Sequence, residues 1–354
     1  MQSGLRNVLL LIAFVALTSV SWPIGTTIDP DSRDASLAGR HGAKIVPVLD
    51  VPISGSANLL WCGTFQLAWN EACNRFGHPI ELRPASPVTA PLNRRSFDRR
   101  SVDEASIFVA SGDVDDGIVQ KIKAGVRKMN APESRLLDGL QPGTGQLVCY
   151  ARLDKALSFP KPFGRLGAVP LAERKVPCFG FLASNEDAGD LRSQTLIHQY
   201  RNADDFVIEL KTTNAEDMLV LAKTSPAATL SDTVHGVLKQ LQASPPSAGG
   251  RDVMVAPCVT FSQAASFPEL EGRAVVENLH WRLLSALQSI EFKMNEKGVT
   301  LHSEAMTSFA CSAEPPPDHV MILRPPFLLL MKRKNAKEPY FVCWIANHDL
   351  LKGG

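Results

Sequence analysis

The sequence lacks the short motifs that mark the common classes of enzyme. It has no G-x-S-x-G nucleophile turn, no H-E-x-x-H helix, no Walker phosphate loop and no complete G-x-G-x-x-G. Its 8 histidines show no metal-ligand spacing, and its 7 cysteines include no C-x-x-C pair. These absences predict a protein that is not an enzyme, with no cofactor, no metal site and no catalytic residue.

A strong charge of either sign is also missing. The 354 residues include 37 Lys or Arg and 36 Asp or Glu, which gives a net charge of +1. This balance argues against a protein that binds nucleic acid or membrane surfaces by charge. One short basic run at residues 94–100 could bind heparin or nucleic acid, but its brevity favours a solvated loop. We therefore expect no nucleic-acid partner.

No hydrophobic run reaches the length of a membrane span. The run Val8–Val20 is too short, and it is preceded by Arg6 and followed by small residues. This pattern predicts a signal peptide over Met1–Ser21, with an uncleaved anchor as the alternative. We expect a secreted or periplasmic protein that leaves the membrane after cleavage, with a mobile leader over residues 22–40 and one domain over residues 41–354.

The cysteines predict no particular disulfide. Because their number is odd, an oxidising compartment leaves at least one thiol unpaired or intermolecular, and most of them lie in apolar sequence that favours burial. Cys311 is the exception, because it falls in a segment that we expect to be an exposed loop. The seven positions are Cys62, Cys73, Cys149, Cys178, Cys258, Cys311 and Cys343.

The clearest helical periodicity covers Ser56–Phe76, where Trp61, Phe65 and Trp69 begin one apolar stripe that ends before Gly77. Cys62 would lie in the first turns of this helix, where the helix dipole lowers the pKa of a thiol. A thiol hydrolase centred on Cys62 is one interpretation, and it needs a histidine nearby. A buried cysteine beside the stripe is favoured over it.

Other segments read as strands or helices from their periodicity. The predicted strands are Lys44–Val51, Ser106–Ala110, Gln146–Tyr150, Asp205–Leu210, Met218–Ala222, Asp252–Ser262, Met321–Leu323 and Phe327–Met331, and the predicted helices are Asp116–Met129 and Ser231–Leu241.

The stretch Ser289–Ile345 carries the most information about function. Ile290–Asn295 alternates apolar and charged residues as a half-buried strand does. A turn or hinge follows at Glu296-Lys297-Gly298, where glycine allows unusual backbone angles. Val299–Ala305 then alternates again, which is compatible with a sheet strand or with a segment that can become one.

This stretch resembles the reactive-loop region of serpins. The resemblance rests on the hinge Asn295-Glu296-Lys297-Gly298, on Pro326-Phe327 before a hydrophobic strand, and on a closing strand pair that ends with Tyr340–Asn347. It is clearest over residues 252–347 and includes a short helix at Phe267–Leu270. The resemblance implies a single α+β domain with large, mainly antiparallel sheets, surrounding helices and an exposed reactive-type loop.

The resemblance also implies a function. A serpin-like peptidase inhibitor would use residues 299–320 as protease bait, with hinge residues Glu296, Lys297, Gly298, Val299 and Leu301. Family spacing places the cleaved bond at Ser312-Ala313, whose small side chains suit a secreted, elastase-like serine protease. Inhibitory serpins carry small residues where Leu301 stands, so a non-inhibitory binding or scaffold protein is the alternative.

Overall fold

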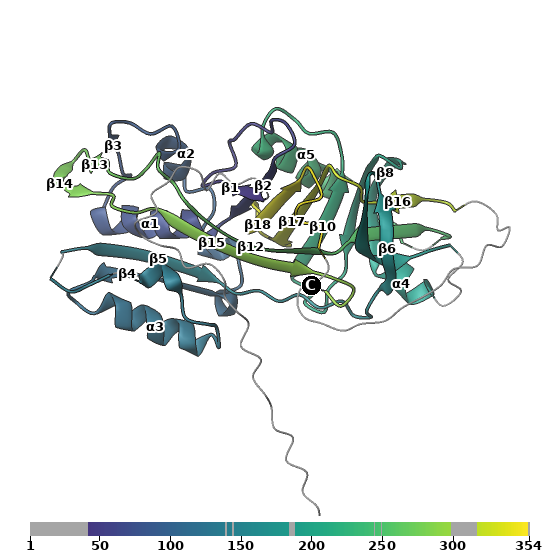
Figure 1. Cartoon of the computed structure of the whole chain (residues 1–354), viewed down its shortest axis with the longest axis horizontal. Helices are drawn as coiled ribbons and strands as arrows, with labels where there is room; N and C mark the ends of the chain where they lie inside the picture. The colour runs from purple at the N-terminus through teal and green to yellow at the C-terminus, as the bar shows by residue number, and fades with distance from the viewer. Residues whose placement is uncertain are drawn as a thin grey trace, which may run out of the picture. The chain divides into compact units, whose positions relative to one another are not determined.

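A seven-stranded sheet forms the centre of the protein (Figure 1). The structure, a computed structural model, describes residues 42–138, 140–143, 145–183, 188–243, 245–248, 250–298 and 317–352. Across the sheet the strands are β1 (Ala43–Ile45), β2 (Asn58–Cys62), β18 (Phe341–Ile345), β17 (Phe327–Arg333), β10 (Asp217–Lys223), β9 (Asp205–Leu210) and β8 (Thr195–Asn202). Neighbouring strands are antiparallel except for the parallel pair β1 and β2.

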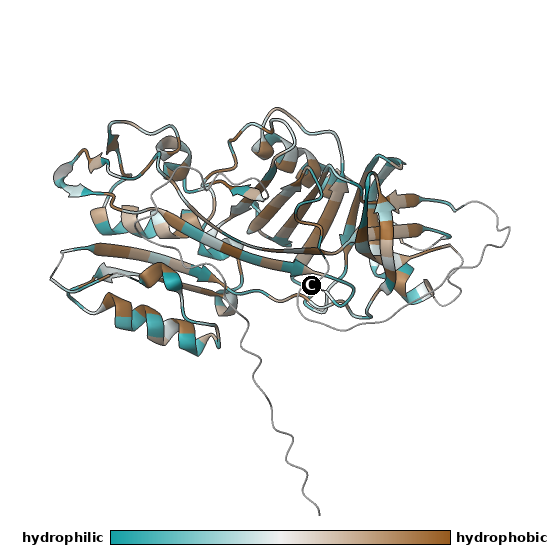
Figure 2. Cartoon of the chain, viewed as in Figure 1, coloured by the Kyte–Doolittle hydropathy of each residue, from teal (hydrophilic) through white to brown (hydrophobic). Residues whose placement is uncertain are grey.

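The inner strands of this sheet are buried on both faces. Every residue of β2 and β18 is buried, and the same holds for all but the last residue of β17. Figure 2 shows that hydrophobic residues fill these strands. Continuous runs such as Phe327-Leu-Leu-Leu-Met331 form strands here because both faces of the sheet are covered.

Smaller sheets surround the central one. A four-stranded sheet has the order β16 (Val320–Ile322), β11 (Val253–Pro257), β7 (Arg174–Phe181) and β6 (Gly164–Leu171). Two separate two-stranded sheets pair β12 (Val259–Ser266) with β15 (Leu287–Met294), and β4 (Ile107–Asp113) with β5 (Leu147–Leu153). A small sheet contains β14 (Asn278–Arg282), β13 (Ala274–Val275) and β3 (Leu82–Arg83).

Helices cover the sheets. Helix α1 (Thr64–Phe76) contacts β4, β5 and β15, while α3 (Ile118–Lys128) packs on β4 and β5. Helix α5 (Leu230–Ala243) packs against β8 and β9, and the short helices are α2 (Thr89–Asn93) and α4 (Gly189–Ser193). Single 3-10 turns lie at Arg99–Ser101, Glu104–Ser106 and Arg135–Leu137. Within the part of the chain that the structure describes, no helix is long and apolar enough to cross a membrane.

The helix predicted over Ser56–Phe76 is wrong in its first part. Residues Asn58–Cys62 form strand β2, and α1 begins only at Thr64, after Gly63. A short apolar run does not distinguish a buried strand from a buried helix, and here pairing with β1 and β18 decides the outcome. The end of the helix is as predicted, because Gly77 has a φ of 82° and its N–H donates to the carbonyl of Cys73.

The other predicted strands and helices are present with shifted boundaries, and the α+β class with large, mainly antiparallel sheets is confirmed. The predicted strand Asp252–Ser262 is two strands, β11 and β12, which belong to different sheets. The prediction has no counterpart for β3, β8, β13, β14, α2 and α4. The predicted helix at Phe267–Leu270 is a turn, and the first predicted strand shortens to Ala43–Ile45. The hairpin of β6 and β7 has no counterpart in the prediction, because Gly164, Gly167 and two prolines interrupt its pattern.

Candidate functional site: the hinge turn after β15

A tight turn follows strand β15, at the hinge indicated by the sequence. The N–H of Asn295 donates to the carbonyl of Gly298 (2.9 Å), and the N–H of Gly298 donates back to the carbonyl of Asn295 (3.2 Å). The side chain of Asn295 also accepts a hydrogen bond from the N–H of Lys297 (3.0 Å). These bonds reverse the chain within four residues.

Glycine is required at the end of this turn. Gly298 has a φ of 125°, which side chains rarely allow. A Cβ atom at this position would lie 2.2 Å from the carbonyl oxygen of Leu157 and 2.8 Å from the Cα of Ser158. The turn therefore packs directly against the backbone of residues 157 and 158.

Residues 157–163, which we call the clamp segment, hold the turn in place. Within this segment, Phe159 donates its N–H to the carbonyl of Lys297 (3.0 Å), and Phe163 donates to the carbonyl of Glu296 (2.8 Å). The rings of Phe159 and Phe163 contact each other with centroids 4.8 Å apart and are buried in the main core. The turn is thus fixed by main-chain bonds that do not depend on its own side chains.

The clamp segment is itself attached to the central sheet. Ser158 accepts a hydrogen bond from the N–H of Thr213 (2.8 Å). The side-chain amide of Gln194 bonds both main-chain groups of Lys161, as donor at 2.7 Å and as acceptor at 3.1 Å. The position of the hinge turn is therefore determined by the ends of β8, β9 and β10.

The hinge carboxylate forms a largely buried ion pair. Arg165 Nη2 on β6 lies 2.7 Å from Oε1 of Glu296, and the two side chains are 26% and 8% exposed. The pKa of the nearby Cys258 thiol is raised to about 11, mainly by burial and then by the charge of Glu296, while the charge of Arg165 acts in the opposite direction. Arg165 thus supplies the positive charge that a carboxylate needs at this depth.

A second buried ion pair anchors the chain just before the clamp segment. Lys155 Nζ lies 2.7 Å from Oδ2 of Asp217, and these side chains are only 7% and 1% exposed. Lys155 also donates to Ser106 Oγ (3.3 Å), and Asn214 donates to Asp217 (2.6 Å). Sequence reasoning missed this pair, because 62 residues separate its members and no local pattern connects them.

The hinge turn lies next to strands that have unpaired edges. Among the described strands, β5 pairs only with β4 and β15 pairs only with β12, although both β5 and β15 contact α1. Gly298 forms antiparallel bridges with Asn295 on one side and with Ser158 on the other. The chain therefore leaves β15 and turns back toward the backbone that follows β5.

Some predicted site residues lie outside the described residues. Val299, Leu301, Ser312 and Ala313 belong to this group, as does Cys311. Of the predicted hinge, the structure describes Glu296, Lys297 and Gly298 and brings them together with the clamp segment.

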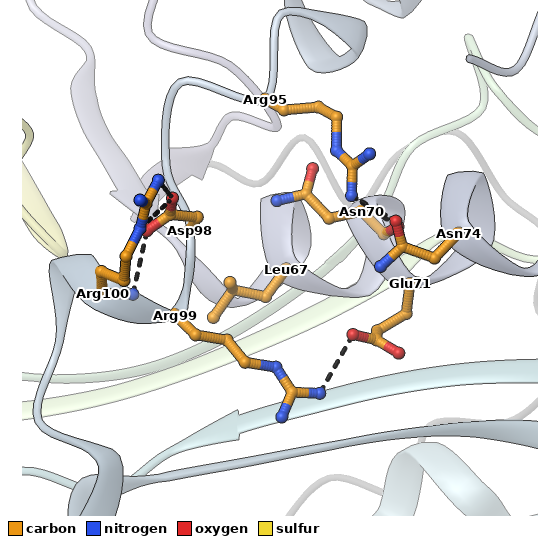
Figure 3. A pocket seen from close by; sticks show the side chains of 8 residues that line it. All are labelled: Leu67, Asn70, Glu71, Asn74, Arg95, Asp98, Arg99 and Arg100. Carbon is orange, nitrogen blue, oxygen red and sulfur yellow. Dashed lines mark hydrogen bonds and ion pairs between the residues drawn. The ribbon is translucent and has the colours of Figure 1, made fainter. Parts of the chain in front are cut away.

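The basic run at residues 94–100 borders a pocket of about 210 Å³ on α1 (Figure 3). Its arginines have nearby polar partners. Arg94 pairs with Asp50, Arg99 with Glu71 at 3.0 Å, and Arg100 with Asp98 at 2.5 Å, while Arg95 donates to Asn74 at 2.5 Å. Figure 3 shows Arg99 pointing toward Glu71 across the pocket. The carboxylates offset the positive charge of the run.

Cys62 does not lie in the first turns of a helix, so the expected lowering of its thiol pKa by a helix dipole is wrong. The residue ends strand β2 instead of beginning a helix, and burial raises the pKa of its thiol. The hydroxyl of Thr64 donates a hydrogen bond to its Sγ at 3.6 Å. A protonated, buried thiol is a poor nucleophile, so this arrangement disfavours a hydrolase centred on Cys62.

Within the described residues no group of three His, Cys, Asp or Glu side chains could hold a metal ion.

The buried thiols predict a loss of stability at alkaline pH. Burial raises the pKa of Cys178 to about 12 and that of Cys258 to about 11, from an ordinary value of 9.0. In the unfolded chain these thiols ionise near pH 9, whereas the folded protein keeps them protonated. The stability that these protonated thiols contribute to the folded protein is therefore fully present below pH 9. It is lost as the pH rises through about 11 to 12.

This effect can be measured by denaturant unfolding between about pH 8 and pH 11, a range that begins below the ordinary thiol pKa of 9.0 and ends near the raised pKa of Cys258. We expect the free energy of unfolding to fall across this range, and to fall less steeply in a Cys178→Ala/Cys258→Ala variant. Equal slopes for the two proteins would contradict the assignment.

Comparisons with known proteins give a likeness of fold to serpins. No family model and no curated protein matches the chain. A serpin from Schistosoma haematobium matches with 12% identity over 83% of this chain and 94% of that one, with a TM-score of 0.47. Serpin48 of Tenebrio molitor matches with 12% identity over 81% and 90%, with a TM-score of 0.43. Human thyroxine-binding globulin, solved with its hormone, matches with 13% identity over 66% of this chain and 64% of its own, with a TM-score of 0.42.

The chain thus spans slightly less than two thirds of the thyroxine-binding globulin structures that it matches. With TM-scores below 0.5, these similarities carry no conclusion about activity, ligand or partner. They are a likeness of fold to serpins of low sequence identity.

Proposed function

We propose that this protein is a secreted or periplasmic, serpin-like peptidase inhibitor that presents residues 299–320 to a serine protease. The observation that carries the proposal is the double pairing of Gly298, with Asn295 at the end of β15 and with Ser158 beyond the end of β5. Because the turn reverses the chain, a segment that continues beyond Gly298 would run antiparallel to β15. It would add a strand between β15 and β5.

Such an added strand has a physical reason to form. The edges of β5 and β15 that pair with neither β4 nor β12 leave main-chain donors and acceptors without a strand partner among the described residues. Each new main-chain hydrogen bond contributes about 0.5–1.5 kcal/mol, so several bonds together can drive the addition. The absence of proline from Lys297 to Glu314 allows those bonds.

The proposed chemistry is the first half of peptide hydrolysis. The protease serine Oγ attacks the carbonyl carbon of Ser312, and the bond to the nitrogen of Ala313 breaks. An ester forms between the protease and Ser312, while the nitrogen takes up a proton and leaves as a new amino terminus. Strand addition that is faster than attack by water would keep the ester intact.

A second candidate function is a binding or scaffold protein with the same fold. Leu301 favours it, because a bulky residue close to the hinge would slow strand addition. The protease would then complete hydrolysis and be released. The two functions differ in the fate of the ester and share the cut near Ser312.

Limited proteolysis with an elastase-like serine protease separates the two functions. An inhibitor should give a covalent complex on a denaturing gel, with the protease ester mapped to Ser312 by mass spectrometry. A protease whose catalytic serine is blocked is the matched control and should give no complex. A cleaved chain without complex but with a raised melting temperature would support the binding protein instead.

Variants of the proposed inserting segment sharpen this test. Leu301→Ala should increase the fraction of protease trapped, and Val299→Arg should abolish trapping while cleavage continues, because a charged side chain cannot enter the sheet. Cleavage with no complex and no change in melting temperature in any of these proteins would overturn strand addition altogether.

A further inference from the structure

A cavity of about 280 Å³ lies between the start of β7 and the chain that follows β18. One wall is formed by Arg174, Lys175 and Val176 of β7. The other wall is formed by His348, Asp349, Leu351 and Lys352. The cavity lies outside the hinge turn and the clamp segment, and nothing in the proposed function uses it.

The charges around this cavity are unbalanced. Three cationic side chains, those of Arg174, Lys175 and Lys352, line it together with a single carboxylate, that of Asp349. In the described part of the chain none of the three cations forms an ion pair or a side-chain hydrogen bond. The pocket of Figure 3 is different, because carboxylates face its arginines. Unbalanced positive charge in a concave site attracts anions.

The walls of the cavity are held in place by the fold. His348 Nε2 donates a hydrogen bond to the carbonyl of Leu171 (2.7 Å), which pairs with Arg174 in the hairpin of β6 and β7, so the second wall is attached to this hairpin. The carbonyl of Leu350 accepts from the N–H of Thr260 (3.0 Å), and Leu351 is only 4% exposed. The site is therefore formed before any ligand arrives, which reduces the entropic cost of binding.

Two residues that line the cavity, Val176 and Leu351, are apolar and buried. Val176 and Leu351 are each 4% exposed, and Val176 is fixed by its pairing with Val169 in the hairpin of β6 and β7. Arg174 lies two residues before Val176 and thus on the same face of the strand. A lining that combines cationic and apolar side chains fits a small organic molecule that carries an anionic group.

We propose that this cavity binds a small phosphate or sulfate monoester. The guanidinium of Arg174 can bind two oxygens of such a group, and Lys175 and Lys352 add positive charge. The organic part of the ligand would contact Val176 and Leu351. The volume equals several water molecules of about 30 Å³ each, enough for a tetrahedral anion with a few attached carbons.

Phenyl phosphate and inorganic phosphate are suitable probes, measured by calorimetry or NMR titration of the full chain at low salt. We expect saturable binding of phenyl phosphate, weaker binding of inorganic phosphate and no binding of phenol. The double variant Arg174→Gln/Lys352→Gln should weaken phenyl phosphate binding at least tenfold. Raising the salt concentration should weaken it as well.

The matched control removes two charges from another surface. Lys121 and Lys123 are exposed on α3, and Lys121→Gln/Lys123→Gln should bind phenyl phosphate as the parent protein does. Val176→Thr, which keeps the side-chain shape, should weaken phenyl phosphate but not inorganic phosphate. Equal affinity in the two double variants, or no saturable binding of either probe to the parent protein, would overturn the proposal.

Discussion

Gly298→Ala is expected to displace the hinge turn and to destabilise the protein by about 3 kcal/mol or more. Two effects combine at this residue. Its φ of 125° is strained for any side chain, at roughly 1–3 kcal/mol, and the new Cβ would overlap the main chain at 2.2 Å from the carbonyl oxygen of Leu157. Because that atom belongs to the backbone, it cannot move aside as the end of a side chain can.

Gly272→Ala is the matched control for this variant. Gly272 also has a positive φ, 73°, but nothing lies within 4 Å of its Cβ position. Its replacement should cost only the backbone strain, about 1–2 kcal/mol. The local measurement is hydrogen exchange of the amides of Phe159 and Phe163, which should speed up in Gly298→Ala alone. Equal destabilisation by the two variants would mean that the turn is not clamped.

Lys155→Met should be the other strongly destabilising change, at about 3–5 kcal/mol. The substitution keeps the apolar stem but leaves Asp217, 1% exposed, as a buried carboxylate without its cation. The free energy of unfolding from denaturant titration is the measurement. Adding Asp217→Leu should recover part of the loss, because the double variant no longer buries an unpaired charge.

Lys161→Met supplies the control within the clamp segment. Lys161 pairs with Asp190 at 3.0 Å, but the two side chains are 50% and 76% exposed. Exposed pairs contribute about 0–1 kcal/mol, so this variant should be nearly neutral. If Lys155→Met were as mild as Lys161→Met, the buried pair would not anchor the chain.

Local sequence patterns could predict the elements of this fold but not all of their types. The alternation in Ile290–Asn295 predicted β15, and the helical periodicity of Asp116–Met129 predicted α3, because each element exposes one face and buries the other. Asn58–Cys62 was placed in a helix because a strand buried on both faces has no alternation to reveal it.

The hinge turn could be predicted, whereas its surroundings could not. Glycine after a short polar run is a local signal, and Gly298 does end a turn. The contacts that fix the turn come from residues 157–165, more than 130 positions away along the chain. Pairs such as Lys155 with Asp217 depend on tertiary packing, which a single sequence does not encode in any local period.

The hairpin of β4 and β5 divides its two faces between different cores. Ala110 and Tyr150 pack with α3 in a small cluster of their own, whereas Val109 and Ala151 pack against the main core. Helix α3 thus adds stability mainly to its own hairpin and little to the central sheet. Loss of this small cluster would be a sub-global opening that leaves the seven-stranded sheet folded. The α3 layer is therefore the part of the described structure that we expect to open at the lowest free energy.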